Sequence, residues 1–200
     1  MKVAALVAAV LAIAVAALAF QQRAAAQSEA RYGRVASEIA QRDVSVRCQG
    51  VLGELLDIGI DAGTVQFDAR GRPADVTHLT RGVCRGLKRF ADDPHSSRLD
   101  CVRTAAACPR EAFETVQAVH TLAHEAVHLA GVRNEAEAEC YGLQTVDLVA
   151  VRLGADRDTA RALADYALAR LYPALPSHYR TDACRDGGSL DLVPGSATFP

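Results

Sequence analysis

The segment His120–Glu139, HTLAHEAVHLAGVRNEAEAE, contains His124 and His128 four positions apart, with Glu125 between them. An α-helix has about 3.6 residues per turn, so the two histidines would lie one turn apart on nearly the same face and could both reach one metal ion. In this H-E-x-x-H arrangement the histidines bind zinc and the glutamate accepts a proton from the attacking water. The segment therefore predicts a metal-binding helix and hydrolytic chemistry.

Apolar residues at helical spacing extend this helix over Pro109–Gly131. Pro109 suits a first turn, and Glu111 and Glu114 favour the positive end of a helix. The apolar positions predict a buried face; they are Phe113, Val116, Val119, Leu122, Ala123, Ala126 and Val127. The alternative is an ordinary helix whose two histidines are solvated or hydrogen-bonded.

A catalytic zinc site needs a third protein ligand beside one open position. Gly131 can adopt the left-handed conformation that ends a helix, and Asn134 with Glu137 has the pattern of an N-cap and capping box that opens a second helix. Glu137 is then structural. Glu135 and Glu139 would share a face of that second helix, so one could bind the metal while the other orients a histidine.

The two motifs together, HEAVH and NEAEAE, resemble the zincin metallopeptidases, specifically the gluzincin branch typified by thermolysin. The second motif of that branch has the form N-E-x-x-[SA]-[DE]. The resemblance implies that Glu135 is the third zinc ligand and that Glu139 contacts a ligand histidine. It covers about residues 117–145 and implies a zincin-like pair of metal-site helices.

The spacer departs from the gluzincin pattern, because only six residues separate His128 from Glu135. The short spacer resembles that of the metzincins, whose pattern is H-E-x-x-H-x-x-G-x-x-H. This sequence matches that pattern from His124 as far as Gly131. Asn134, however, stands where their third histidine belongs, and an amide oxygen is a poor zinc ligand. If the two helices form a tight antiparallel hairpin, a rise of about 1.5 Å per residue places Glu139 nearer than Glu135 to the level of the histidines. Glu135 could then reach the metal only if the two helices splay apart. The motif favours Glu135, and Glu139 is the alternative.

The N-terminal segment reads as an export signal. Lys2 precedes an unbroken apolar run, Val3–Phe20, and Ala24 and Ala26 form an A-x-A cleavage signature. These features predict a secretory signal peptide cleaved after Ala26, with an uncleaved N-terminal membrane anchor as the alternative. Both versions place residues 27–200 outside the cytoplasm, secreted or tethered.

Residues 27–200 are expected to form a single domain. Removal of Lys2 and Arg23 leaves 20 basic and 24 acidic residues, a net charge of −4. The sequence has no basic patch with interleaved aromatic residues, so nucleic acid is not an expected partner.

All six cysteines lie in the exported part, and an even number in an oxidising compartment predicts three disulfides. Cys101 and Cys108 flank a short loop and are expected to pair. For the remaining four we expect Cys48 with Cys84 and Cys140 with Cys184, although spacing alone leaves their connectivity open. Zinc ligation by cysteine is disfavoured because no C-x-x-C spacing occurs.

The other patterns predict a mainly helical α+β domain. Residues Thr64–Asp68 and Asp75–Leu79 alternate as strands do and flank a turn, so they predict a β-hairpin. The zincin resemblance implies that an edge strand of this sheet borders the cleft and pairs with an extended substrate. Cover of the helical core is its alternative role. Further elements are a helix or stalk over Ser28–Arg42, a strand before Cys48, and helices at Leu52–Leu56, Thr80–Ala91, Asn134–Leu153 and Arg157–Tyr172.

Three residues outside the motif, Tyr141, His178 and Tyr179, are candidates to stabilise an oxyanion. His120 is expected in the core or behind a ligand histidine. The sequence thus predicts an exported, disulfide-bonded zinc metallopeptidase, with Zn²⁺ as cofactor and a peptide or protein as substrate. The alternatives are a noncatalytic domain with a structural zinc and a metal-free surface interaction module.

Overall fold

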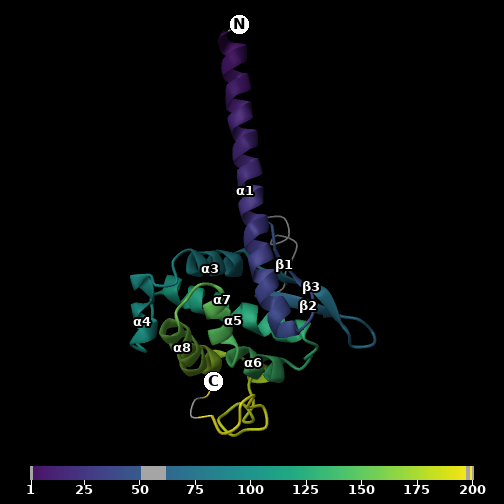
Figure 1. Cartoon of the computed structure of the whole chain (residues 1–200), viewed down its shortest axis with the longest axis vertical. Helices are drawn as coiled ribbons and strands as arrows, with labels where there is room; N and C mark the ends of the chain where they lie inside the picture. The colour runs from purple at the N-terminus through teal and green to yellow at the C-terminus, as the bar shows by residue number, and fades with distance from the viewer. Residues whose placement is uncertain (1, 51–61, 197–198, 200) are drawn as a thin grey trace.

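The computed structural model describes residues 2–50, 62–196 and 199, and the chain is mainly helical with one small sheet (Figure 1). The helices are α1 (Lys2–Ala40), α3 (Arg81–Asp92), α4 (Asp100–Arg103), α5 (Arg110–Leu129), α6 (Glu135–Leu143), α7 (Val146–Arg152) and α8 (Arg157–Tyr166). The strands are β1 (Ser45–Cys48), β2 (Gly63–Phe67) and β3 (Pro73–Leu79). The helix expected at Leu52–Leu56 lies outside the described residues.

Helix α5, which carries the histidine motif, is the centre of the domain. It packs against α1, α3, α6 and α7 and against strands β2 and β3. Its second half is buried on every side, including Leu122, Ala123 and Ala126, rather than along one stripe. The helix begins one residue after Pro109, which is its N-cap, and ends two residues before Gly131, whose φ of 108° is the left-handed conformation expected there.

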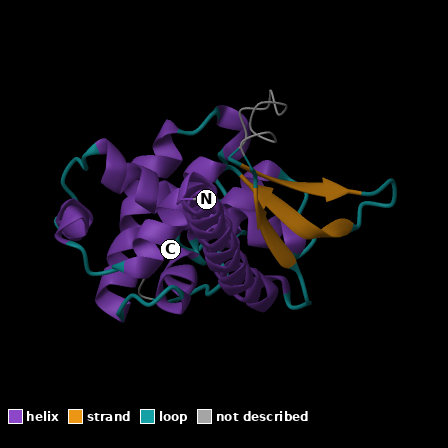
Figure 2. Cartoon of the chain, turned by 90° about the horizontal axis from the view of Figure 1, so that it is seen from above, coloured by secondary structure: helices purple, strands orange, loops and turns teal. Residues whose placement is uncertain are grey.

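The sheet has the strand order β1-β3-β2 and lies to one side of the helices (Figure 2). Strands β2 and β3 form the expected antiparallel hairpin, with Val65 opposite Thr77. The strand expected before Cys48 is β1, which pairs parallel to β3. Strand β2 is therefore an edge strand of the sheet formed by the described residues, and it packs against α5.

Helix α1 settles the choice between a helix and a stalk over Ser28–Arg42, because it is one continuous helix as far as Ala40. Its last turns join the core through Tyr32, Val35 and Ala36. The part before residue 28 projects away from the body (Figure 1), and Val10–Phe20 is exposed. By length and composition α1 could cross a membrane, a property it shares with signal sequences.

Three disulfides connect the pairs that we expected. Cys48–Cys84 joins β1 to α3, Cys101–Cys108 closes a short loop before α5, and Cys140–Cys184 joins α6 to the C-terminal segment. The Cα–Cα separations are 6.0, 5.2 and 5.4 Å, within the range of disulfide bonds. Both the disulfides and the apolar N-terminal helix are consistent with an extracytoplasmic location.

The prediction of one continuous helix over Asn134–Leu153 is wrong. The helix is interrupted at Gln144 and Thr145, which separate α6 from α7. The Thr145 hydroxyl bonds to the carbonyls of Tyr141 and Gly142, and the Gln144 amide bonds to those of Cys140 and Leu190. These side chains bond to the last carbonyl groups of α6 alongside the backbone N–H groups of Gln144 and Thr145, which bond to the carbonyls of Cys140 and Gly142.

The expected helix Arg157–Tyr172 is also too long. Helix α8 ends at Tyr166 and continues as a π-helical turn, Ala167–Leu171, and a 3-10 turn, Tyr172–Ala174. Pro173 cannot donate a backbone hydrogen bond and cannot continue a regular helix. The residues expected on its inner face, Leu163, Tyr166, Ala167 and Leu171, are buried, and Arg170 is exposed.

Candidate functional site

Helix α5 brings the two motif histidines together, and α6 adds a carboxylate. The Nε2 atoms of His124 and His128 lie 2.9 Å apart. Oε2 of Glu135 lies 3.3 Å from Nε2 of His124 and 3.2 Å from Nε2 of His128. Asn134 caps α6 by accepting a hydrogen bond from the Glu137 N–H, as expected, and this cap places Glu135 in the first turn of α6.

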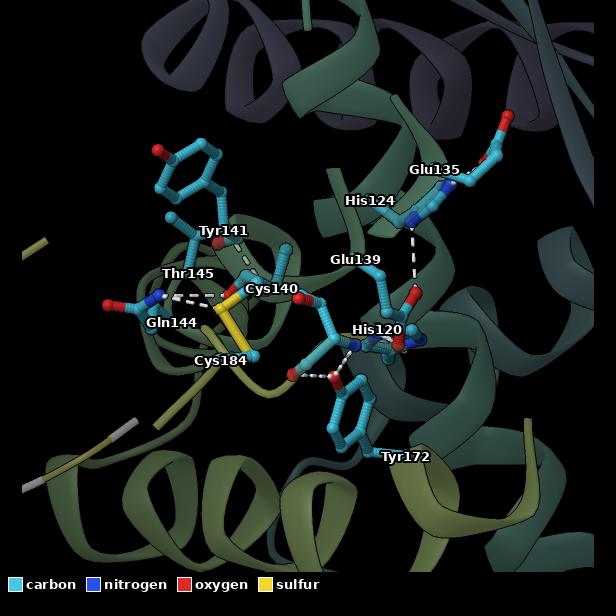
Figure 3. A network of polar contacts seen from close by, with 12 residues as sticks. His120, His124, Glu135, Glu139, Cys140, Tyr141, Gln144, Thr145, Tyr172 and Cys184 are labelled. Atoms are coloured by element: carbon cyan, nitrogen blue, oxygen red, sulfur yellow. Dashed lines mark hydrogen bonds and ion pairs between the residues drawn. A yellow bond between two sulfur atoms is a disulfide. The ribbon is translucent and has the colours of Figure 1, made fainter. Parts of the chain in front are cut away.

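Glu139 lies behind the histidines and does not share their Nε2 side. Its Oε2 is 3.0 Å from Nδ1 of His124, and its Oε1 is 2.9 Å from Nε2 of His120 (Figure 3). These are ion-pair distances, although the angles fall outside hydrogen-bond geometry. Glu139 and His120 are both buried. A carboxylate in this position fixes the ring orientation of a ligand histidine.

The orientation of His128 is fixed by the backbone. Its Nδ1 lies 2.7 Å from the carbonyl oxygen of Val132, so Nδ1–H donates and Nε2 carries the lone pair. Val132 follows Gly131, so the turn that ends α5 also supplies this acceptor. The Nε2 atoms of the two rings and Oε2 of Glu135 thus meet at a common position, all within 4.8 Å of one another.

The carboxylates around this position favour the protonated form of His124 when no metal is bound. Burial alone would lower the pKa of His124, but Glu135, Glu139 and Glu125 outweigh it and raise that pKa to about 9. Burial and the neighbouring His124 lower the pKa of His128. Burial would raise the pKa of Glu139, yet His120 and His124 lower it to about 2, and the hydrogen bond with His124 lowers the pKa of Glu135.

The donor set fits a zinc ion. Two imidazole nitrogens and one carboxylate oxygen are the ligands of many catalytic zinc sites, and bonds of about 2.0–2.1 Å at tetrahedral angles separate ligand atoms by about 3.3 Å. The two distances from Glu135 match that separation, and the 2.9 Å between the histidines is somewhat shorter. The residues present are therefore suited to hold Zn²⁺.

Glu125 is held by the sheet. Its side chain is buried, and its Oε2 accepts a hydrogen bond of 3.2 Å from the hydroxyl of Thr77, which is fully buried on β3. Gly63 of β2 lies against the same side chain: a Cβ at Gly63 would come within 2.6 Å of Glu125 Cγ. The hairpin thus fixes the carboxylate that the motif assigns to proton transfer.

Two cavities of about 200 and 430 Å³ meet at this site, and both are lined by Gly63, His124, Glu125 and Tyr179. The smaller follows β2 from Gly63 to Phe67, and the larger has an apolar wall of Leu171, Leu175 and Pro176. A third cavity of about 690 Å³ on the outer side of the hairpin contains neither the histidines nor Glu125, so its size says nothing about the chemistry.

The three candidates outside the motif lie in different places. Tyr179 lines both cavities, and its ring centroid is 5.9 Å from that of His124. His178 stacks on Tyr179 at 4.4 Å and lines only the larger cavity. Tyr141 lines neither cavity and points away from His124 (Figure 3). Of the three, only Tyr179 lines the cavity that contains both motif histidines.

Thr77 and Gly63 are two residues of the site that the sequence patterns do not predict. Alternation along the strands placed Thr77 in the hairpin and left Gly63 just before its first strand, and it gave no sign that either would contact Glu125, about 48 and 62 positions later. A glycine at the start of an edge strand can mark a close approach of another group, which is the one signal that was available.

The site therefore combines a His-His-Glu cluster, a buried glutamate and an edge strand in one cleft. Comparisons of the chain with protein-family models, with curated proteins and with solved structures find no match.

Proposed function

We propose that this protein is an exported zinc-dependent peptidase. The observation that supports this most is the convergence, in one cleft, of ligand atoms from His124, His128 and Glu135 with the buried carboxylate of Glu125. Each group alone has a structural explanation. Their common position, next to an open cavity and to an edge of β2 that no other described strand pairs with, is what a hydrolytic site needs.

In this proposal His124, His128 and Glu135 hold the zinc ion, while Glu139 and the Val132 carbonyl orient the two rings. Zinc supplies a Lewis acid that polarises the scissile carbonyl and makes water a better nucleophile. Glu125 accepts the proton of the attacking water and delivers it to the leaving amine.

The geometry favours Glu135 over Glu139 as third ligand. Glu135 lies on the Nε2 side of both histidines, whereas Glu139 contacts the opposite nitrogen of His124. Glu135 is also partly exposed toward the cleft, and Glu139 is buried between two imidazoles. Glu139 is therefore the orienting acid.

Strand β2 provides the place for a substrate. It is an edge strand, it lines the smaller cavity, and its first residue contacts Glu125. An extended peptide can add to such an edge through backbone hydrogen bonds. Tyr179, which lines the same cavity as β2, is the candidate to donate a hydrogen bond to the developing oxyanion.

The accessibility of the site supports catalysis over a structural role. A structural zinc site is closed by four protein ligands, whereas two cavities reach this cluster and the described residues place three candidate ligand atoms at it. The apolar N-terminal helix and the three disulfides support export.

The test is Glu125→Gln in the exported protein, loaded with zinc and incubated with a mixed peptide library. The substitution keeps the size of the side chain but removes its basicity, so turnover should fall by about 10²-fold or more while zinc content stays equal. Equal cleavage by the parent and by Glu125→Gln would contradict the proposed role of Glu125.

A further inference from the structure

Arg133 occupies one end of the cleft. It lies in the short connection between α5 and α6 and lines the cavity of about 200 Å³ together with His124, Glu125 and His128. Its guanidinium carbon lies 5.4 Å from the centroid of the Phe67 ring. The same ring contacts His128 edge-on, with a centroid distance of 6.2 Å. Phe67 therefore holds the guanidinium beside the candidate metal ligands.

The hairpin turn leaves room for this arginine. Gly71 has a φ of 78°, and a Cβ there would come within 3.2 Å of the Arg133 guanidinium. Glycine meets both requirements, because it adopts this conformation without strain and has no side chain to displace the arginine. The guanidinium is thus placed between an aromatic ring and a backbone turn.

The charge of Arg133 has no close counter-ion among the described residues. No described carboxylate lies within ion-pair distance of it, and the nearby Asp68 is already bonded to Arg72 at 2.8 Å and to the N–H groups of Arg70 and Arg72. Of the described residues that line either of the two cavities at the site, Arg133 is also the one lysine or arginine.

We propose that Arg133 binds a carboxylate of the peptide substrate, an inference that rests on the proposed function. A guanidinium offers N–H groups in a fork that matches a carboxylate, and stacking on an aromatic ring leaves those groups free. The same charge disfavours basic residues at this end of the cleft.

The length of β2 between Glu125 and Arg133 indicates where in the substrate the carboxylate would lie. The strand runs from Gly63, beside Glu125, to Phe67, beside Arg133, and four residues of strand span about 13 Å. A peptide extended along β2 would present its carboxylate about two to four residues from the bond that is cleaved. An acidic side chain and the terminal carboxylate of a short peptide share this chemistry.

The experiment measures binding without turnover. The full chain carrying Glu125→Gln is exported, purified in mild detergent, loaded with zinc and immobilised. It is then offered pools of acetylated peptides that differ only in having Asp and Glu or Asn and Gln, each pool made with a free and with an amidated C-terminus. Retained peptides are counted by mass spectrometry. A second column carries Arg133→Gln in addition, and a third carries Arg70→Gln, an exposed arginine of the same hairpin that lines neither cavity.

Retention of the carboxylate-bearing peptides should exceed that of their amide partners by about tenfold, because hydrogen bonds between charged groups are among the stronger ones. Arg133→Gln should abolish the preference, and Arg70→Gln should keep it. Preference within the amidated pools assigns the site to an acidic side chain; preference for free C-termini regardless of composition assigns it to the chain terminus.

Equal retention of acids and amides, or a preference that survives Arg133→Gln, would overturn the inference. Incubation of the same pools with the parent protein separates this result from the proposed function. Cleavage without any acid preference would leave a peptidase whose Arg133 is not a recognition site. Acid retention through Arg133 without cleavage would uphold the binding site and contradict the peptidase.

Discussion

Glu125 shows how one buried side chain can be held from outside its own helix. Its carboxylate accepts a hydrogen bond from Thr77, whose hydroxyl also lies 3.1 Å from the carbonyl oxygen of Thr64. A hydroxyl has one proton to donate, so it serves one of these acceptors at a time. Thr77 is a positioning residue for the proposed reaction, because it acts only through Glu125.

Replacement of Thr77 by valine should lower kcat about tenfold and leave KM and zinc content unchanged. Valine has nearly the same shape but no hydroxyl, and a hydrogen bond to a charged group contributes roughly 1.5–3 kcal/mol. Thr77→Ser is the matched control, since it keeps the hydroxyl and should restore turnover. Steady-state kinetics of both variants on one peptide substrate test this prediction. Equally low kcat values for Thr77→Ser and Thr77→Val would mean that the packing of Thr77, and not its hydroxyl, matters.

Zinc binding should release about one proton per ion between pH 7 and 8. The pKa of His124 is raised to about 9 in the metal-free protein, so its Nε2 carries a proton that zinc must displace. The raised pKa also means that this proton stabilises the metal-free fold below about pH 6.5 and that the contribution is lost as the pH rises through 9.

Calorimetry of zinc binding in two buffers with different ionisation enthalpies measures the proton release. The release should fall toward zero above pH 9, where His124 has already lost the proton. Binding without proton release at pH 7.5 would contradict the assignment of His124 as a ligand.

At the scale of elements, the site depends on how closely α6 approaches α5. Gly142 of α6 lies directly on His124: a Cβ there would come within 3.0 Å of the His124 Cα and 3.2 Å of its backbone N. Backbone atoms cannot move aside as a flexible side chain does. The glycine therefore sets the spacing that lets Glu135 and Glu139 reach the two sides of the His124 ring.

Gly142→Ala should push the helices apart, lower the free energy of unfolding by about 1–3 kcal/mol and weaken zinc binding. Gly50→Ala is the control, because no described residue comes within 4 Å of a Cβ at Gly50 and its φ is not positive. Chemical denaturation and zinc titration of both variants provide the comparison. A Gly142→Ala protein with unchanged zinc affinity would show that the contact does not set the metal-site geometry.

Elements with local signals could be predicted from the sequence, and contacts between distant segments could not. Helical spacing of apolar residues predicted α5, and alternation predicted the β2–β3 hairpin. The break after Leu143 depends on Gln144 reaching Leu190, and the contact of Thr77 with Glu125 depends on the sheet lying against α5. Helical periodicity and strand alternation carry no information about such partners.

At the scale of the whole molecule, α1 has two parts with different surroundings. Residues 10–23 are exposed, whereas Tyr32, Val35, Ala36 and Ala40 belong to the hydrophobic core. The predicted cleavage after Ala26 falls where the surroundings change. Cleavage there would release the apolar segment and leave the core contacts intact.

Residues 27–200 should therefore unfold at the same temperature as the full chain in detergent. Tyr32→Ala should lower the free energy of unfolding by about 3–5 kcal/mol in either form, because it removes a buried aromatic side chain. Val10→Ala, in the exposed part, is the control and should have no effect. Thermal denaturation followed by circular dichroism measures all of these. A large loss of stability on removal of residues 1–26 would mean that the projecting segment supports the domain.

The zinc content of the purified, exported protein tests the central claim most directly. The protein must be oxidised and free of metal-binding tags, and His124→Ala must be measured beside it. The proposal predicts about one zinc per molecule in the parent and none in His124→Ala, with the disulfides intact in both. No zinc in the parent after supplementation would contradict a metallopeptidase and leave α5 as a buried helix with two hydrogen-bonded histidines.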